Sequence, residues 1–165
     1  LFGVNETVRE YVRLTQELDA RDTPVVLVLF GDHKPWMGNG GSVYEEMGID
    51  FDTSTLAGFR NYYATPYLIW ANRAAKEVLG ADFTGDGGDF SPCFLMTRLF
   101  DACGWAGPGY MQLSRAMRDI SPLLHTNGLF LHDGVLTSVL SDTDRSFYRS
   151  WLAVQYYREH VAAYS

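Results

Sequence analysis

The sequence contains few of the residues that several large protein classes require. Only two of its 13 basic residues are lysines, and its formal net charge at pH 7 is −7. Surfaces that bind nucleic acid need clustered basic side chains to neutralise phosphates, so we expect no nucleic acid as a partner. The scarcity of lysine also argues against a polybasic patch that would hold the chain on an anionic membrane.

Long hydrophobic runs and pairable cysteines are lacking too. No stretch approaches the ~20 consecutive apolar residues that cross a bilayer, and the first residues do not resemble a signal peptide. Cys93 and Cys103 lie in one predicted helix, about 15 Å apart along its axis, so they cannot form a disulfide. Because 47% of the 165 residues are hydrophobic, we expect a single domain with a buried core.

The strongest local pattern is an unbroken apolar run over 25–30, followed by Gly31 and then by Asp32 and His33. Such a run predicts a strand buried on both faces, as in a parallel sheet. Ligands of open α/β sheets bind at the carboxyl ends of strands, and Gly31 permits a sharp turn there. A carboxylate beside a neutral imidazole suits a divalent metal such as Zn²⁺ or Mn²⁺. Alternatively, Asp32 caps the following loop and His33 is an ordinary loop histidine.

Three motifs in a fixed order carry a resemblance to a known family. In chain order they are Gly31-Asp32-His33-x-Pro35, Tyr44-Glu45-Glu46-x-Gly48 and Tyr63-x-Thr65-Pro66-Tyr67-Leu68-Ile69-Trp70-x-Asn72. Together they resemble the C-terminal half of the lipoteichoic-acid-synthase-like sulfatases, the phosphoglycerol transferase family of the alkaline phosphatase superfamily. The resemblance implies an α/β fold with a mostly parallel sheet flanked by helices. Residues 1–165 would form the C-terminal portion of a larger sulfatase-type catalytic domain.

The resembled enzymes transfer a phosphoglycerol or phosphoethanolamine headgroup from a lipid during the synthesis of cell-envelope polymers, through a phospho-threonine or phospho-serine. Their metal is held by an early acidic residue, the nucleophile and a late Asp-His pair, which matches Asp32 and His33. The resemblance implies Mn²⁺ in first place, with Zn²⁺, Mg²⁺ or Ca²⁺ as alternatives. The early ligand and the nucleophile have no counterpart before Asp32. We therefore assign no catalytic residue and expect this chain alone to be inactive.

The resemblance also implies partners and a location. The parent protein would be anchored in the membrane by segments that precede Leu1, with this soluble part on the extracellular face of the bacterial cell membrane. The substrate would be a lipid-linked phosphodiester headgroup, which Lys34 and Trp36 could contact. The alternative for these two is a solvated lysine and a packed tryptophan. An exposed sheet edge in a partial domain would allow a homo-oligomer to form.

Two other functions stay open. The same fold could serve as a sulfatase or as a phosphatase or phosphodiesterase of the same superfamily, with a Cys or Ser nucleophile in the preceding sequence. The chain could also be a non-catalytic α/β interaction domain in which the Asp-His pair is incidental.

The rest of the chain predicts helices, a second strand and a hairpin. Helical periodicity and capping residues predict helices over 4–20, 42–47, 91–103, 108–120 and 142–163, the last of them packed on the sheet. Residues 53–63 indicate a short helix or an irregular segment. Residues 66–71 predict the second strand.

An antiparallel hairpin is predicted near 123–132, because Asn127-Gly128 suits a two-residue type I′ turn. This register would pair His125 with Phe130. His125 is a further candidate metal ligand, and the alternative is an ordinary sheet histidine.

Overall fold

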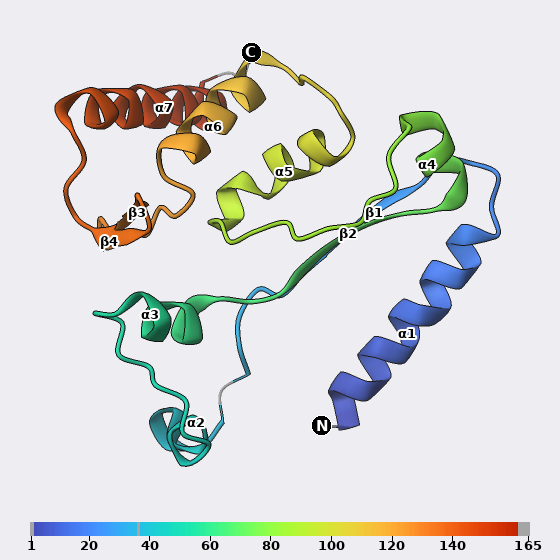
Figure 1. The fold of residues 1–165 in the computed structure, drawn as a ribbon, viewed down its shortest axis with the longest axis horizontal. Helices are drawn as coiled ribbons and strands as arrows, with labels where there is room; N and C mark the ends of the chain where they lie inside the picture. Colours follow the sequence, from blue (N-terminus) through green and yellow to red (C-terminus); the bar gives the residue numbers. More distant parts are fainter. Residues whose placement is uncertain (1, 36, 162–165) are drawn as a thin grey trace.

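The computed structural model describes residues 2–35 and 37–161 as a mixed α/β structure (Figure 1). In chain order the elements are α1 (Phe2–Asp19), β1 (Val26–Phe30), η1 (Asn39–Gly41), α2 (Ser42–Glu46), α3 (Leu56–Tyr63), β2 (Tyr67–Ala71), α4 (Arg73–Leu79), η2 (Pro92–Phe94), α5 (Leu95–Ala102), α6 (Gly109–Ile120), β3 (Phe130–His132), β4 (Val135–Thr137) and α7 (Asp142–His160). The predicted helices are present in the described residues, positions 162 and 163 of the last predicted helix lie outside them, and α4 is an additional helix. No helix in the described part of the chain combines the length and apolar character needed to cross a membrane.

The strands β1 and β2 form a two-stranded antiparallel ribbon, and no parallel pair occurs in the described residues. The apolar run indicated burial but carried no information on direction. The chain leaves β1, passes through α2 and α3, and enters β2 at the end where β1 finished, so Phe30 lies opposite Tyr67. The strand β1 is half-buried and not buried on both faces as predicted, because the described helices leave much of the ribbon uncovered; Phe30 is 62% exposed.

A buried asparagine joins the ribbon to the helices on either side of it. Asn72 is fully buried, and its Oδ1 accepts hydrogen bonds from the backbone N–H groups of Val25 and Ala75, both at 2.9 Å. The bond from Ala75 caps the N-terminus of α4. The Nδ2 group donates to three backbone carbonyls, that of Leu18 in the last turn of α1 and those of Arg21 and Thr23 between α1 and β1. One side chain therefore joins the end of α1, the segment that leads into β1 and the start of α4 with five hydrogen bonds.

The helix α1 stands beside the ribbon with much of its predicted apolar face exposed (Figure 1). Val8 is 52% exposed and Val12 is 51% exposed. The helix is held near its C-terminal end, where Asp19 Oδ1 accepts from the backbone N–H of Arg73 at 2.9 Å. The periodicity predicted the helix correctly, but the described chain does not cover its apolar face.

The C-terminal part of the chain packs around one buried cluster. Phe94 of η2, Met117 of α6 and Trp151 of α7 form its centre. Trp151 Nε1–H donates to Ser114 Oγ at 3.0 Å, so the polar atom of the largest core side chain has a partner. The helix α7 therefore packs on α6, whereas its apolar stripe was predicted to face a sheet (Figure 1).

The predicted hairpin near 123–132 forms only in part, as a chain reversal with one isolated antiparallel bridge between Leu124 and Phe130, and its register differs by one residue. The N–H of His125 donates to the carbonyl of Leu129 at 2.9 Å, and the N–H of Gly128 donates to the carbonyl of His125 at 2.9 Å. His125 therefore pairs with Leu129 and not with Phe130. The loop has three residues, with Gly128 at φ 73°, the position that a bulge glycine takes after a type I turn.

The tight two-residue turn of this region lies one strand later, between β3 and β4. Asp133 and Gly134 both have positive φ, 49° and 77°, as a type I′ turn requires. They join two three-residue strands in antiparallel register.

Candidate functional site

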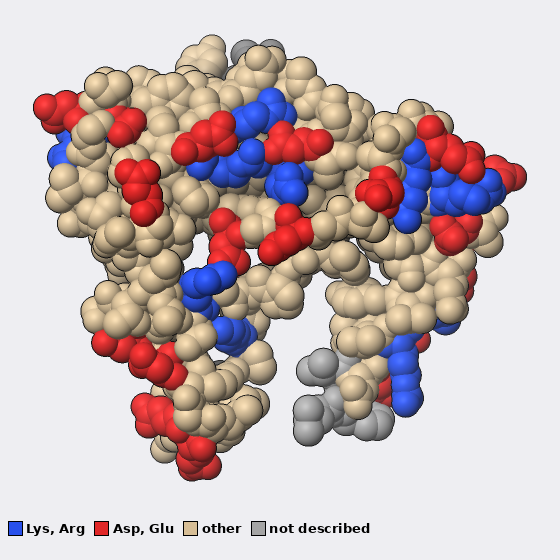
Figure 2. All heavy atoms as spheres, viewed as in Figure 1, with Lys and Arg blue, Asp and Glu red and all other residues tan. Residues whose placement is uncertain are grey.

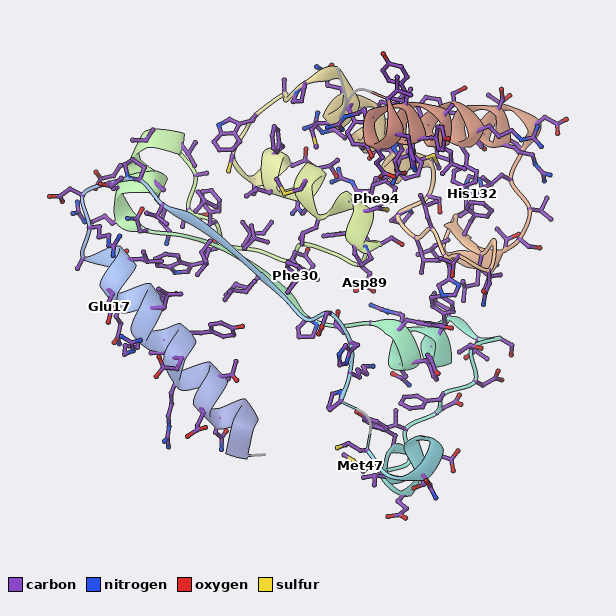
Figure 3. The ribbon with its side chains drawn as sticks, turned by 180° about the vertical axis from the view of Figure 1, so that it is seen from behind. Glu17, Phe30, Met47, Asp89, Phe94 and His132 are labelled. Atoms are coloured by element: carbon purple, nitrogen blue, oxygen red, sulfur yellow. The ribbon has the colours of Figure 1, made fainter. Side chains whose placement is uncertain are left out.

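The carboxyl end of β1 opens on a cleft of about 410 Å³, a size typical of small-molecule sites. Four segments line it: the end of β1, α3 with the start of β2, the segment before α5, and the 123–131 hairpin. Figure 3 shows Phe30 at the end of β1 and Asp89 on the segment that leads to α5. Most of the lining is apolar, so the few polar groups decide what chemistry the cleft supports.

Asp32 and His33 lie side by side at the rim of this cleft. Asp32 Oδ2 is 3.5 Å from His33 Nε2, and the two side chains are 80% and 78% exposed. Asp32 lines the cleft, whereas His33 does not. The structure therefore brings the two predicted ligands together, at the end of the strand where they were expected.

Backbone groups orient both side chains. Asp32 Oδ1 accepts from the N–H of His33 at 2.9 Å, which leaves Oδ2 available. His33 Nδ1 lies 3.1 Å from the carbonyl oxygen of Lys34. A carbonyl can only accept, so Nδ1 carries a hydrogen, and in the neutral ring Nε2 then keeps a free lone pair. The two available ligand atoms are the ones that lie 3.5 Å apart.

This separation suits a shared cation but supplies only half of a metal site. Metal bonds of about 2.0–2.2 Å at the tetrahedral angle hold neighbouring ligand atoms about 3.4 Å apart. Within the described residues, however, no group of three or more His, Cys, Asp or Glu side chains could hold a metal ion. Two ligands leave a four-coordinate site open. Asp32 and His33 thus fit a divalent metal as two of its ligands.

A second Asp-His pair in the chain shows that a short distance between the two side chains does not by itself identify a metal site. His132 Nε2 lies 3.7 Å from Asp133 Oδ2, a spacing close to that of Asp32 and His33. Neither His132 nor Asp133 lines the cleft. Neighbouring Asp and His residues therefore reach this distance readily, and it is the position at the cleft that distinguishes the first pair.

The turn that presents Asp32 is held by a threonine that the sequence reasoning missed. The N–H of Gly31 donates to the carbonyl of Pro66 at 2.9 Å, but Pro66 has no N–H to give in return. Thr65 Oγ1 donates to the carbonyl of Gly31 at 2.7 Å in its place. A Cβ at Gly31 would lie 3.0 Å from the Cβ of Thr65, so glycine permits this approach. The Thr-Pro dipeptide could have predicted this hydrogen bond. Proline has no N–H, so the carbonyl of the strand residue paired with it needs a donor from a neighbouring side chain.

Of the two predicted substrate contacts, Lys34 is engaged within the protein and Trp36 lies outside the described residues. Lys34 Nζ donates to the carbonyl of Asn61 in α3 and lies 5.9 Å from the centre of the Phe51 ring. Burial lowers the pKa of Lys34. The lysine ties the loop that carries Asp32 to α3, and its contact with a substrate headgroup stays a prediction.

His125 lines the hairpin side of the cleft, between two aromatic rings. Its ring centroid is 4.5 Å from that of Tyr63 and 5.2 Å from that of Phe59. His125 Nδ1 accepts from the N–H of Asn127 at 3.3 Å, so Nε2 carries the hydrogen of the neutral ring. In this tautomer neither nitrogen is free to ligate a metal, and His125 is a hydrogen-bond donor to the cleft.

An ion pair between two of the lining segments was also missed. Arg60 of α3 pairs with Asp89 on the segment that precedes η2, and both residues line the cleft. The hydroxyl of Tyr67 donates to the carbonyl of Gly88 at 3.2 Å and holds the same segment against β2. Because these partners are distant in sequence, no local motif could have paired them.

Comparison of the chain with protein-family models, with curated proteins and with solved structures finds no match. The function of the cleft is therefore inferred from the residues that line it.

Proposed function

We propose that this chain is the C-terminal portion of a metal-dependent phosphoglycerol- or phosphoethanolamine-transferase-like enzyme that acts on lipid headgroups. The observation that carries the proposal is the pair of free ligand atoms, Asp32 Oδ2 and His33 Nε2, 3.5 Å apart at the rim of a 410 Å³ cleft. The ordered motifs around the pair support the reaction class. Asp32 and His33 would bind a divalent metal, Mn²⁺ in first place, and such a metal neutralises charge on a transferring phosphoryl group.

The open surfaces of the described chain support a larger parent domain. Both outer edges of the β1–β2 ribbon lack a neighbouring strand there, and the apolar face of α1 is exposed. In the proposed parent, further strands extend the ribbon into a mostly parallel sheet flanked by helices. The remaining metal ligands and the nucleophile come from those added elements. The parent is anchored in the membrane elsewhere and holds this portion on the extracellular face.

Turnover of a nitrophenyl phosphodiester tests the proposal. This chain alone should show no turnover, whereas the parent polypeptide should be active with Mn²⁺. Asp32→Ala in the parent should reduce activity at least about 100-fold, because it removes a metal ligand. Asp133→Asn is the matched control, since it removes the charge of an exposed carboxylate beside a histidine that lies away from the cleft, and asparagine tolerates the positive φ of this turn position. Activity in the chain alone, or undiminished activity in the Asp32→Ala parent, would contradict the proposal.

A non-catalytic interaction domain is the second candidate, and the open ribbon favours it. Alternate residues of β1 bond to β2, so the backbone groups of Val26, Val28 and Phe30 face outward. A second copy pairing at this edge would form a homo-oligomer. Sedimentation of a dimer that Val28→Pro abolishes would favour this candidate, because proline removes an outward donor without breaking the ribbon.

A further inference from the structure

The cleft is walled by aromatic rings. Five aromatic side chains line it: Phe30, Phe59, Tyr63, Tyr67 and Phe90. Two pairs of these rings are in contact, with centroids 4.6 Å apart for Phe59 and Tyr63 and 4.8 Å apart for Tyr67 and Phe90. The face of an aromatic ring carries negative potential and attracts cations, most strongly where water is excluded.

The ionised side chains that line the cleft leave one negative charge unbalanced. Arg60 is the basic residue of the lining, and it is paired with Asp89. His125 is neutral in the tautomer that its hydrogen bond requires. Asp32 remains, because His33, whose Nε2 lies 3.5 Å from Asp32 Oδ2, does not line the cleft. Figure 2 shows further Asp and Glu side chains gathered over the α2 end of the molecule.

No cationic side chain in the described part of the chain lies over the cleft rings. Lys34 lies over Phe51 and Arg158 over Tyr110, and neither ring belongs to the cleft. An anionic ligand would meet the charge of Asp32 without compensation. A neutral apolar ligand would leave that charge without a partner.

We infer that the cleft binds an organic ammonium group carried on a small apolar stem. The ammonium lies against the aromatic rings, with the carboxylate of Asp32 as its counter-ion. A volume of 410 Å³ accommodates a choline-sized group and its stem. This inference goes beyond the proposed metal site and does not require it.

Choline and its uncharged carbon isostere, 3,3-dimethyl-1-butanol, test the preference for charge directly. The two molecules have nearly the same shape, so a difference in affinity reports on the positive charge. Binding is measured by ligand-observed NMR titration of this chain in EDTA, which removes any contribution from a metal at Asp32 and His33. Choline should bind at least about fivefold more tightly. Equal affinities, or no saturable binding of choline, would overturn the inference.

Two substitutions separate the carboxylate from the rings. Asp32→Asn should weaken choline severalfold and leave the isostere unchanged; Asp32 is 80% exposed, so the fold should survive, as far-UV circular dichroism would verify. Phe90→Leu should reduce the difference in affinity between choline and the isostere, because it removes one aromatic ring from the cleft. Asp133→Asn, outside the cleft, is the control and should change neither. A choline preference that survives both cleft substitutions would also overturn the inference.

The same ammonium chemistry could come from a lipid headgroup or from a free amine. Diheptanoylphosphatidylcholine, added below its micelle concentration, separates the two sources. Tighter binding than choline assigns the cleft to a lipid headgroup, and equal binding assigns it to a free amine; both retain the inferred ammonium. Choline binding together with an inactive parent enzyme would retain the inference while removing the proposed function.

Discussion

Replacing Asn72 tests how the ribbon that delivers Asp32 to the cleft is held. The side chain is fully buried and makes five hydrogen bonds to backbone groups of three segments. Asn72→Ala removes the N-terminal cap of α4, which is worth about 1 kcal/mol. It also leaves the N–H of Val25 without its acceptor, at about 1–3 kcal/mol for a buried donor. With the lost carbonyl partners, we expect the free energy of unfolding to fall by about 2–5 kcal/mol.

A second substitution at the same position isolates the donor side of the network. Asn72→Asp keeps the shape and the two accepted hydrogen bonds. It replaces Nδ2 by an oxygen that faces three carbonyls, those of Leu18, Arg21 and Thr23. The buried charge should cost about 3–5 kcal/mol near neutral pH. The cost should shrink in acid, because a protonated carboxyl donates one of the lost bonds.

Urea denaturation followed by tryptophan fluorescence measures both variants. Asn127→Ala is the matched control, because that side chain is exposed in the hairpin loop and should change stability by less than about 0.5 kcal/mol. A loss below about 1 kcal/mol for Asn72→Ala would refute the role assigned to this residue.

Two further predictions concern ionised groups in the C-terminal part. Burial alone would raise the pKa of Asp101, but hydrogen bonds from Arg118 and Arg115, at 2.7 and 2.6 Å, outweigh burial and lower it. Asp101→Asn should therefore lower the free energy of unfolding by about 1–3 kcal/mol at neutral pH. In urea denaturation, the difference between the variant and the original chain should vanish as the pH falls through the lowered pKa of Asp101. The carbonyl of Ile120 raises the pKa of His132, with smaller contributions from Asp133 and Asp144. The protonated His132 therefore stabilises the fold fully at pH values below its pKa in the unfolded chain, about 6.5. This stabilisation is lost as the pH rises through its higher pKa in the folded protein. His132→Asn should lower Tm more at about pH 5.5 than at about pH 8.5, and equal losses would count against this.

Local signals predicted the helices well because their causes are local. The helix α7 begins at Asp142 as predicted, and Ser141 caps it by accepting from the N–H of Asp144. Pro92 and Gly104 bracket η2 and α5 in the same way. What lies against a helix depends on distant residues, so periodicity in α1 and α7 identified an apolar face without identifying its partner.

The strands show the limit of a purely local interpretation. The apolar run of β1 indicated a strand, but direction depends on where the chain returns, and α2 and α3 bring it back antiparallel. In the hairpin, Asn127-Gly128 and Asp133-Gly134 both suit a two-residue turn. The structure forms both turns, the first as a three-residue loop with Gly128 as the bulge residue and the second as a two-residue turn.

The sequence predicted only the part of the site that depends on residues adjacent in the chain. Asp32 and His33 are adjacent in sequence and come at the end of a strand, so their placement followed from local pattern. Thr65, Arg60 and Asp89 act across the cleft, and only the fold brings them there.

The account depends most on a single claim, that Asp32 and His33 together bind a divalent cation. Substoichiometric Mn²⁺ broadens the NMR signals of nearby imidazole protons, and the chain offers four histidines for comparison. The signal of His33 should broaden first, and Asp32→Ala should suppress that broadening several-fold, whereas Asp133→Asn should not. Broadening of His33 that is unchanged by Asp32→Ala, or no stronger than that of His132, would contradict the claim.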